Sequence, residues 1–304
     1  MTDEYRSEIE AILDRAFSSE DPDEIDRIAR QVLRSDPDNP EALILLADCA
    51  GEEEERVGIL RKALAVVRSS MPEMDTREQV EDPIEDKGIL YLAILQRLAF
   101  SLFTLGETTE AFDLSRRIVE MDPEDETFGK TLFYRCLLEM GEYGTILDFS
   151  DNDENRSPAR AHARAIALFH VQGPSKDARG ALWDLFEVGP DIPLFLIGYW
   201  GEPHEGDEQE MEDFNFTLLF EDPWNRSEDL LRWLTRATIL FAYVTDRLNP
   251  EIMENIERLV EDLQIQQLFQ ERMKSLREEV LNLDEVRSRK RDLSAIRSLR
   301  ALKW

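Results

Sequence analysis

The chain has 304 residues, which is enough for one large domain, two ordinary domains or an array of repeats. Hydrophobic residues make up 42% of the chain, so a sizeable core can form and wholesale disorder is excluded. The 66 Asp and Glu residues outnumber the 36 Lys and Arg. The resulting net charge of −30 argues against a surface that binds nucleic acid phosphates or an anionic membrane.

Two explanations of this acidity stay open. The chain has 29 Arg but only seven Lys, and a cytoplasm of high salt concentration would favour such a surface. A basic protein partner would also favour it. The charge is uneven, because residues 283–304 carry +4 and the rest of the chain carries −34.

The cysteines and the N-terminus predict a cytoplasmic protein. Cys49 and Cys136 are too few for a disulfide scaffold, and both lie in apolar helical contexts, so we expect two buried free thiols in a reducing compartment. The first residues are acidic and start no apolar run, which predicts that no secretory signal is present. No stretch reaches ~18 apolar residues without a charge, so we expect no membrane-spanning helix.

Apolar residues recur at spacings of three and four along nearly the whole chain, which predicts an all-α fold. Two degenerate helix–turn–helix units come first, one ending near Pro37 and the next running from Leu43 to Ala63. The segment 70–87 is polar and acidic and contains two prolines, so we expect a loop there.

The clearest helix–turn–helix unit ends at Pro123. Its first helix carries an apolar stripe, and Gly106 then turns the chain. Ala111 is small where the two helices of the pair cross closely. Pro123 ends the second helix, because proline lacks an N–H and clashes with the preceding turn. The apolar stripe and the core positions of the second helix are Leu95, Leu98, Leu102, Ser115 and Ile118.

A second unit, from His162 to Pro190, repeats this spacing. Eleven residues separate Leu95 from Gly106, and eleven separate His162 from Gly173. Seventeen residues separate each of these glycines from the proline that closes its unit. The repetition predicts two helix pairs of the same geometry.

The pattern changes in the last third of the chain. A helix is predicted over 207–220, which the run Asp222-Pro223-Trp224 should end, and a longer helix is predicted over 225–248. Asn249-Pro250 predicts an N-cap followed by a first-turn proline. We expect residues 201–304 to form a helical C-terminal cap. Its remaining helices are predicted at about 250–262, 264–282 and 284–302.

The acidic stretch 202–222 has two interpretations. It is a capping helix that buries its aromatic residues, or it offers an acidic and aromatic surface to a basic amphipathic peptide. The aromatic residues concerned are Trp200, Phe214, Phe216 and Trp224.

The basic C-terminal helix has three interpretations. It docks onto the acidic surface of its own chain, it binds a partner, or it attaches weakly to a membrane, which the charge of the remaining chain makes unattractive. Arg297 and Arg300 lie beside its apolar face, and Lys303 lies near its end, where cations suit the helix dipole. The apolar face consists of Leu293, Ile296, Leu299 and Leu302.

No arrangement of residues points to catalysis or to a cofactor. His162 and His170 lie about 12 Å apart along a helix and cannot share a metal ion, and His204 completes no known ligand spacing. Cys136 could pair with a histidine, but a thiol in an apolar site has a raised pKa and is inert. Phosphate-binding loops and the Gly-x-Ser-x-Gly motif are absent. We therefore expect no catalytic residue, no metal and no cofactor.

The segments 95–123 and 162–190 resemble the 34-residue tetratricopeptide (TPR) repeat, in which W-x2-L-G-x2-Y is followed by A-x3-F and a closing proline. The resemblance covers roughly residues 8–200, including a truncated unit over 132–149. It implies about five helix pairs in a right-handed α-solenoid, followed by the C-terminal cap. The first helices of such pairs line a concave surface.

The resemblance also places seven side chains on this concave surface, where a peptide or protein partner would bind. Some relatives clamp a terminal carboxylate there, but the equivalent positions hold Gln96, Phe100 and Thr104, so that clamp is absent. The seven residues are Asp48, Gln96, Phe100, Lys130, Tyr134, Arg160 and His170.

A narrower resemblance is to bacterial repeat proteins related to the suppressor-of-tumorigenicity-protein family. It adds no catalytic motif, and this chain continues about 70 residues past Leu234, beyond the extent of that family. The runs that carry the resemblance are 98–107, 121–125, 189–198, 206–208 and 233–234.

These observations imply a non-catalytic adaptor, scaffold or assembly factor. Its partner would be a protein or peptide, which can be basic, with no direct contact to nucleic acid or membrane. One alternative is an acidic decoy that imitates nucleic acid and occupies a basic protein. Another is an enzyme with a site in 200–248, which a well-formed pocket with a perturbed carboxylate would support. A third is that the charge reflects only a salty cytoplasm.

Overall fold

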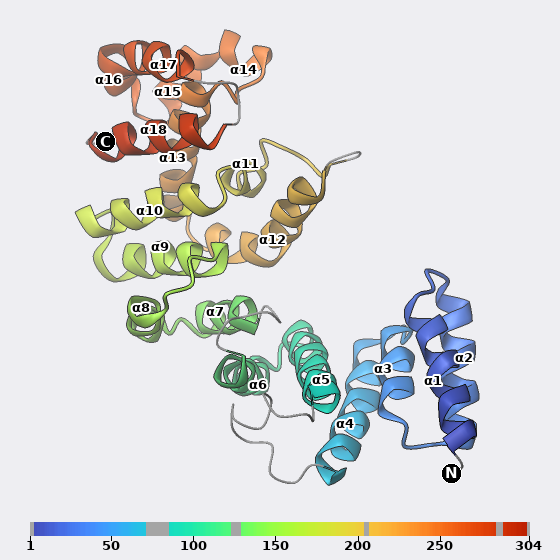
Figure 1. Cartoon of the computed structure of the whole chain (residues 1–304). Helices are drawn as coiled ribbons and strands as arrows, with labels where there is room; N and C mark the ends of the chain where they lie inside the picture. Colours follow the sequence, from blue (N-terminus) through green and yellow to red (C-terminus); the bar gives the residue numbers. More distant parts are fainter. Residues whose placement is uncertain (1–2, 71–84, 123–128, 204–206, 284–287, 303–304) are drawn as a thin grey trace. The chain divides into compact units, whose positions relative to one another are not determined.

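The computed structural model describes residues 3–70, 85–122, 129–203, 207–283 and 288–302 (Figure 1). Within these ranges every regular element is a helix, which confirms the all-α prediction. The chain divides into two compact units, Met1–Cys136 and Leu137–Trp304. The boundary predicted between residues 200 and 201 lies inside the second unit.

The first unit consists of helices that pack in chain order. From α1 to α6, each helix contacts its neighbour in the sequence. Residues 71–84 of the predicted loop and the closing Pro123 lie outside the described residues. The helices are α1 (Asp3–Phe17), α2 (Pro22–Ser35), α3 (Pro40–Asp48), α4 (Glu53–Ser70), α5 (Glu85–Thr104), α6 (Thr108–Met121) and α7 (Gly129–Met140), the last of which continues into the second unit.

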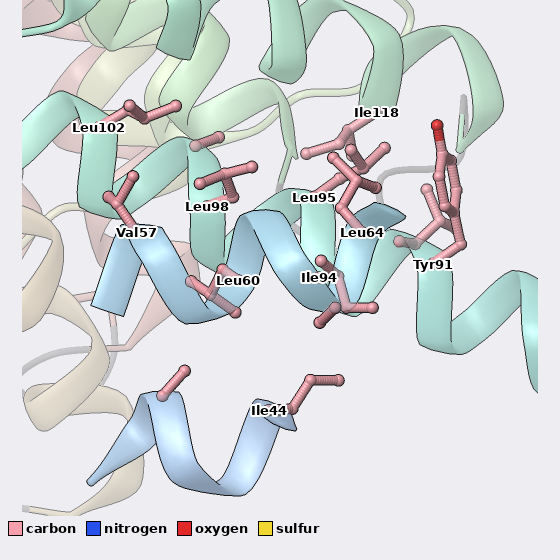
Figure 2. Packing of buried hydrophobic residues seen from close by; sticks show 14 of the residues in the cluster. Ile44, Val57, Leu60, Leu64, Tyr91, Ile94, Leu95, Leu98, Leu102 and Ile118 are labelled. Atoms are coloured by element: carbon pink, nitrogen blue, oxygen red, sulfur yellow. The ribbon is translucent and has the colours of Figure 1, made fainter. Parts of the chain in front are cut away.

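The main core of the first unit lies between α3, α4, α5 and α6. Leu60 and Leu64 of α4 belong to one buried cluster with Ile94 and Leu95 of α5 and Ile44 of α3 (Figure 2). Leu60, Ile94 and Leu95 are each 0% exposed. Fully burying such a side chain contributes about 1.5 to 3 kcal/mol, so the apolar stripes hold these helices together.

The helices begin where the sequence supplies a cap. Asn39 Oδ1 accepts a hydrogen bond from the Ala42 N–H at 2.9 Å, and Pro40 follows it in the first turn of α3. Asn249 Oδ1 accepts one from the Ile252 N–H at 2.9 Å, and Pro250 follows, as predicted. Each cap satisfies a backbone donor that a helix leaves unpaired at its N-terminus.

The two strong helix–turn–helix units are helix pairs in the structure. Gly106 lies between α5 and α6 with φ of 79°, and Gly173 follows the ninth helix with φ of 66°. Both values lie in the left-handed region that L-residues with a Cβ rarely adopt. Ala111 and Ala178, the small residues predicted at the crossings, are 0% exposed.

Replacing Gly106 with alanine is expected to lower the free energy of unfolding of the first unit by about 1 kcal/mol, because the backbone there needs positive φ. Gly58 lies inside α4, and nothing lies within 4 Å of a Cβ built on it. Gly58→Ala is therefore a matched control that should raise stability by about 0.5 to 1 kcal/mol. Denaturation followed by circular dichroism compares the two, and equal effects would contradict the assigned turn.

The second unit is built around α13, which packs against α10, α11, α12, α17 and α18. Twelve of its residues are buried. The helices of this unit are α8 (Tyr143–Asn152), α9 (Pro158–Gln172), α10 (Lys176–Val188), α11 (Ile192–Leu196), α12 (Glu208–Asn225), α13 (Glu228–Thr245), α14 (Pro250–Glu254), α15 (Ile256–Asp262), α16 (Gln266–Leu268), the π-helical turn η2 (Phe269–Met273), α17 (Lys274–Leu281) and α18 (Arg289–Arg300).

The prediction that Asp222-Pro223-Trp224 ends a helix is wrong. The helix α12 continues through Pro223 to Asn225. Proline costs one hydrogen bond in this last turn, but Pro223 and Trp224 are buried there, and Trp224 Nε1 donates a hydrogen bond to His162 Nδ1 on α9. Packing of the last turn offsets the missing backbone bond.

Two predicted helices and one predicted buried cysteine need correction. The helix predicted over 250–262 is interrupted at Asn255, and the one predicted over 264–282 contains the π-helical turn η2. The described part of the last helix begins at Arg289, with Ser288 as its N-cap. Cys136 is buried as predicted, whereas Cys49 is half-buried because it caps the end of α3.

Candidate functional site

Three of the predicted concave-face residues lie on α3 and α5. Asp48 on α3 accepts hydrogen bonds from Arg97 Nε on α5, at 3.0 Å to Oδ1 and 3.2 Å to Oδ2. Because Gln96 adjoins Arg97 in the chain, the structure brings Asp48 close to this part of α5. Gln96 and Phe100 are half-buried and lie one turn apart on α5. This part of the predicted surface is therefore accessible, and Asp48 is engaged in an ion pair.

Lys130 and Tyr134 lie one turn apart on α7. Lys130 is 6% exposed and Tyr134 is 0% exposed, with the ring of Tyr134 edge-on to Phe133 at 5.9 Å between centroids. Little of either side chain is available to a partner.

The two predicted residues of the second unit lie on α9 but are not neighbours. His170 is exposed and stacks on Tyr143, with 4.3 Å between ring centroids and 7° between planes. Partial burial and the positive charge of Arg226 lower the pKa of His170. Arg160 lies about 15 Å away along the helix, where its Nε and Nη2 donate to the carbonyl oxygen of Ser150 at 2.9 Å and 2.8 Å.

Arg160 lines a cavity of about 480 Å³ in the second unit. The α9 side of the cavity presents Arg156, in the segment before α9, and Arg160 and Arg164, one turn apart on α9, and the α10 side presents two carboxylates. Small apolar residues, Ala161, Ala181 and Val188, lie between them. The charged lining residues are Asp153, Glu154, Arg156, Arg160, Arg164, Asp184, Glu187 and Arg300.

Most of these charges already have partners. Arg164 Nη1 lies 2.6 Å from Asp151 Oδ1, and Arg300 Nη2 lies 2.7 Å from Asp184 Oδ1 and 2.9 Å from Glu187 Oε1. Arg156 is exposed and makes no hydrogen bond or ion pair with the described residues. The site is therefore a polar cavity with ordered donors and acceptors on opposite walls.

The contacts of Arg300 bear out one of the three interpretations of the C-terminal helix. In this structure α18 docks on α10 and α13, with Ala295, Ile296 and Leu299 buried. The acidic residues that it meets, Asp184 and Glu187, belong to its own chain. The first interpretation, intramolecular docking, is confirmed.

Sequence reasoning named Arg160 but missed Arg156 and Arg164. The signal was partial, because only Arg160 and Arg164 lie one turn apart on α9, whereas Arg156 precedes the helix. Their function as one wall of a cavity depends on α10 and α18, which no local pattern specifies.

Aromatic residues of α12 cover His162. The His162 ring lies 5.1 Å from that of Phe216 and 5.9 Å from that of Trp224, between centroids. Of the four aromatic residues concerned, Trp224 is 0% exposed, whereas Trp200, Phe214 and Phe216 are half-buried, so the capping helix with buried aromatics is borne out only in part. Burial lowers the pKa of His162 to about 3.

Asp213 on α12 is a carboxylate with a perturbed pKa. Burial raises this pKa to about 6, aided by Asp191, Glu212 and Asp207, while a hydrogen bond from Gln209 Nε2 at 3.0 Å opposes the rise. Asp213 lies in the segment named for the enzymatic alternative, but it lines neither the cavity above nor the second cavity of about 430 Å³ near α15.

The described residues offer neither a metal site nor a membrane-spanning helix. They contain no group of three or more His, Cys, Asp and Glu that could hold a metal ion, and His204 lies outside them. In the same part of the chain, no helix combines the length and the apolar character needed to cross a membrane.

The geometry defines an all-helical protein built from paired helices. Comparison with protein-family models, with curated proteins and with solved structures found no match.

Proposed function

We propose that this protein is a non-catalytic module that binds a polypeptide partner, as an adaptor, scaffold or assembly factor of the cytoplasm. The observation that carries the proposal is the charged cavity beside the α9/α10 pair. Its lining combines guanidinium groups and carboxylates that are mostly paired within the chain, and the exposed Arg156 guanidinium is left to meet a polar partner segment. The two free cysteines support a reducing location.

We propose further that the paired helices belong to a TPR-type right-handed solenoid. The equal spacings of the α5/α6 and α9/α10 pairs, their glycines at positive φ and their small buried alanines support this. In this proposal Asp48, Gln96 and Phe100 contribute to the partner surface of the first unit. Lys130 and Tyr134 underlie that surface, and Arg160 and His170 serve the second unit.

Arg156→Glu is expected to weaken partner binding about tenfold, because it reverses the exposed charge on the α9 wall of the cavity. Arg289→Glu makes the same charge change at an exposed position of α18 that does not line the cavity. Wild type and both variants are used as baits in the native lysate at low salt and at about 0.5 M salt, with quantitative mass spectrometry. A protein retained by wild type and Arg289→Glu but lost by Arg156→Glu is the predicted outcome. Identical profiles for all three baits would refute the proposal.

A second candidate function is the acidic decoy, which the charge distribution favours. Each unit contains 33 Asp and Glu, against 16 Lys and Arg in the first unit and 20 in the second. A decoy predicts capture of basic proteins that vanishes at high salt and on addition of competing DNA or RNA. Binding through the cavity also weakens at high salt, but it predicts retention when DNA or RNA is added.

A further inference from the structure

A second cavity, of about 430 Å³, lies in the C-terminal part of the second unit. Its floor is apolar and nearly closed to solvent, since Val260 is 3%, Phe269 is 4% and Tyr243 is 6% exposed. Met253 and Ile256 complete the floor. The rim is polar and is formed by Glu257, Glu261, Gln266, Gln270 and Lys274. An apolar depression of this size with a polar rim has the form of an anchor site for a partner side chain.

The backbone around this cavity is irregular at two adjacent places. Gln264, between α15 and α16, has φ of 58°, which is strained for a residue with a Cβ. The turn η2, which supplies Phe269 and Gln270, is π-helical. Arg236 holds this connection, because its Nε donates to the Leu263 carbonyl oxygen at 2.6 Å and its Nη2 to Gln264 Oε1 at 3.3 Å. Strained residues and π-turns concentrate at functional sites.

The charge around the cavity is negative. The helices α14 and α15 contain five acids and one arginine, and the two rim acids, Glu257 and Glu261, lie one turn apart on α15. Both are exposed. Lys274 stands on the α17 side as the only cation of the lining. A ligand that matches this pattern carries a cation next to an apolar group.

We propose that this cavity docks a basic amphipathic segment of a partner protein, with an apolar side chain on the floor and a Lys or Arg beside Glu257 and Glu261. The inference rests on the proposed function, because it assumes that the chain binds a protein. To that proposed function the inference adds the location of one contact and the chemistry of the partner segment that makes it. Helix-in-groove recognition uses this combination of an apolar anchor and flanking charge.

The test uses a synthetic Leu/Lys amphipathic peptide of about four helical turns, with a Ser/Lys peptide of equal charge and a Leu/Glu peptide as comparisons. The full chain is labelled at its methionine methyl groups, and NMR follows their signals. The Met253 signal is expected to move with the Leu/Lys peptide alone. Met121, in the core of the first unit, is the internal control and should stay unchanged.

Variants then locate the contact. Gln270→Trp places a large ring on the rim and is expected to weaken Leu/Lys binding about tenfold, whereas Gln267→Trp changes an exposed neighbour that does not line the cavity. Glu257→Gln with Glu261→Gln should weaken binding more than Glu251→Gln with Glu254→Gln, which removes the same charge from the neighbouring turns of α14.

Several results would overturn the inference. They are binding of the Leu/Lys peptide without movement of Met253, equal loss in Gln270→Trp and Gln267→Trp, or movement of Met253 caused by self-association of the chain. A native partner that depends on Arg156 but binds Gln270→Trp normally would remove this docking site and leave the proposed function intact. A native partner that is lost by Gln270→Trp but retained by Arg156→Glu would remove the charged cavity as its binding site and leave this docking site intact.

Discussion

Arg247→Met is expected to lower the free energy of unfolding of the second unit by about 3 to 5 kcal/mol. The Arg247 side chain is 1% exposed and joins three elements. Its Nε donates to Asp191 Oδ1 before α11 at 2.7 Å, and its Nη1 and Nη2 donate to Asp292 of α18 at 2.7 Å and 3.0 Å. Methionine fills similar space but leaves the buried carboxylate of Asp292 without its cation.

The balance of forces on Arg247 explains the size of this effect. Burial lowers its pKa, but hydrogen bonds and charges of Asp292 and Asp191 raise it, and the net direction is upward. The guanidinium therefore stays charged inside the unit. Removing one partner of such a pair exposes the full cost of burying the other.

Tryptophan fluorescence measures this effect in the second unit alone, because all five tryptophans follow residue 136. Urea denaturation of the full chain, followed by this fluorescence, then gives the change in the free energy of unfolding of the second unit. Arg232→Met is the matched control, since Arg232 pairs with Glu228 across one turn, with 40% and 84% of the side chains exposed, and should cost less than about 1 kcal/mol. Arg247→Met with Asp292→Leu is expected to recover most of the loss. Equal stability of Arg247→Met and Arg232→Met would contradict the prediction.

The sequence predicted helices and turns well wherever a local signal decides the structure. Gly106, Gly173 and the Asn249 cap act within a few residues of themselves, and the structure has them in the predicted places. The π-helical turn after Leu268 has no such signal. The continuation of α12 through Pro223 depends on His162, which is 62 residues away from Trp224 in the chain.

Partner choice among charged residues was beyond sequence reasoning for a related reason. Arg247 pairs with Asp292, which is 45 residues away in the chain, and with Asp191, which is 56 residues away. Arg300 pairs with Asp184, which is 116 residues away. With 66 acids in the chain, composition offers each arginine many equivalent partners. Only packing of α10, α13 and α18 selects among them, so intramolecular docking of the last helix was one of three interpretations rather than a deduction.

His162 should make the second unit sensitive to acid. The unfolded chain protonates this histidine near its ordinary pKa of 6.5, whereas the folded chain keeps it neutral down to about 3. Its contribution to stability is therefore complete above pH 6.5 and is lost as the pH falls toward 3. Between pH 7 and pH 4 the loss from this group is about 3 kcal/mol, from 1.36 kcal/mol per pH unit.

His162→Asn removes the titration but keeps an acceptor near the position of Nδ1 for Trp224. At pH 7 the variant is expected to be less stable than wild type by about 2 to 3 kcal/mol, because it leaves space among the aromatic rings. That deficit should shrink steadily as the pH is lowered to 4, because only the wild-type protein loses unfolding free energy through protonation of His162. Urea denaturation followed by tryptophan fluorescence at several pH values measures it. His170→Asn, at the exposed stack with Tyr143, is the control and should change the pH dependence less than His162→Asn does.

The geometry of the His162–Trp224 pair gives a second reason, beyond burial, why stability should fall with decreasing pH. His162 Nδ1 accepts the Trp224 Nε1–H at 3.1 Å, so the neutral ring carries its proton on Nε2, which is buried and has no hydrogen-bond partner among the described residues. Protonation would add an N–H at Nδ1, and two donors would then face each other inside the core. The charged form thus loses both solvent and the hydrogen bond from Trp224, which links α9 to the end of α12. A parallel pH dependence in wild type and His162→Asn would show that carboxylates, and not this pair, control acid unfolding.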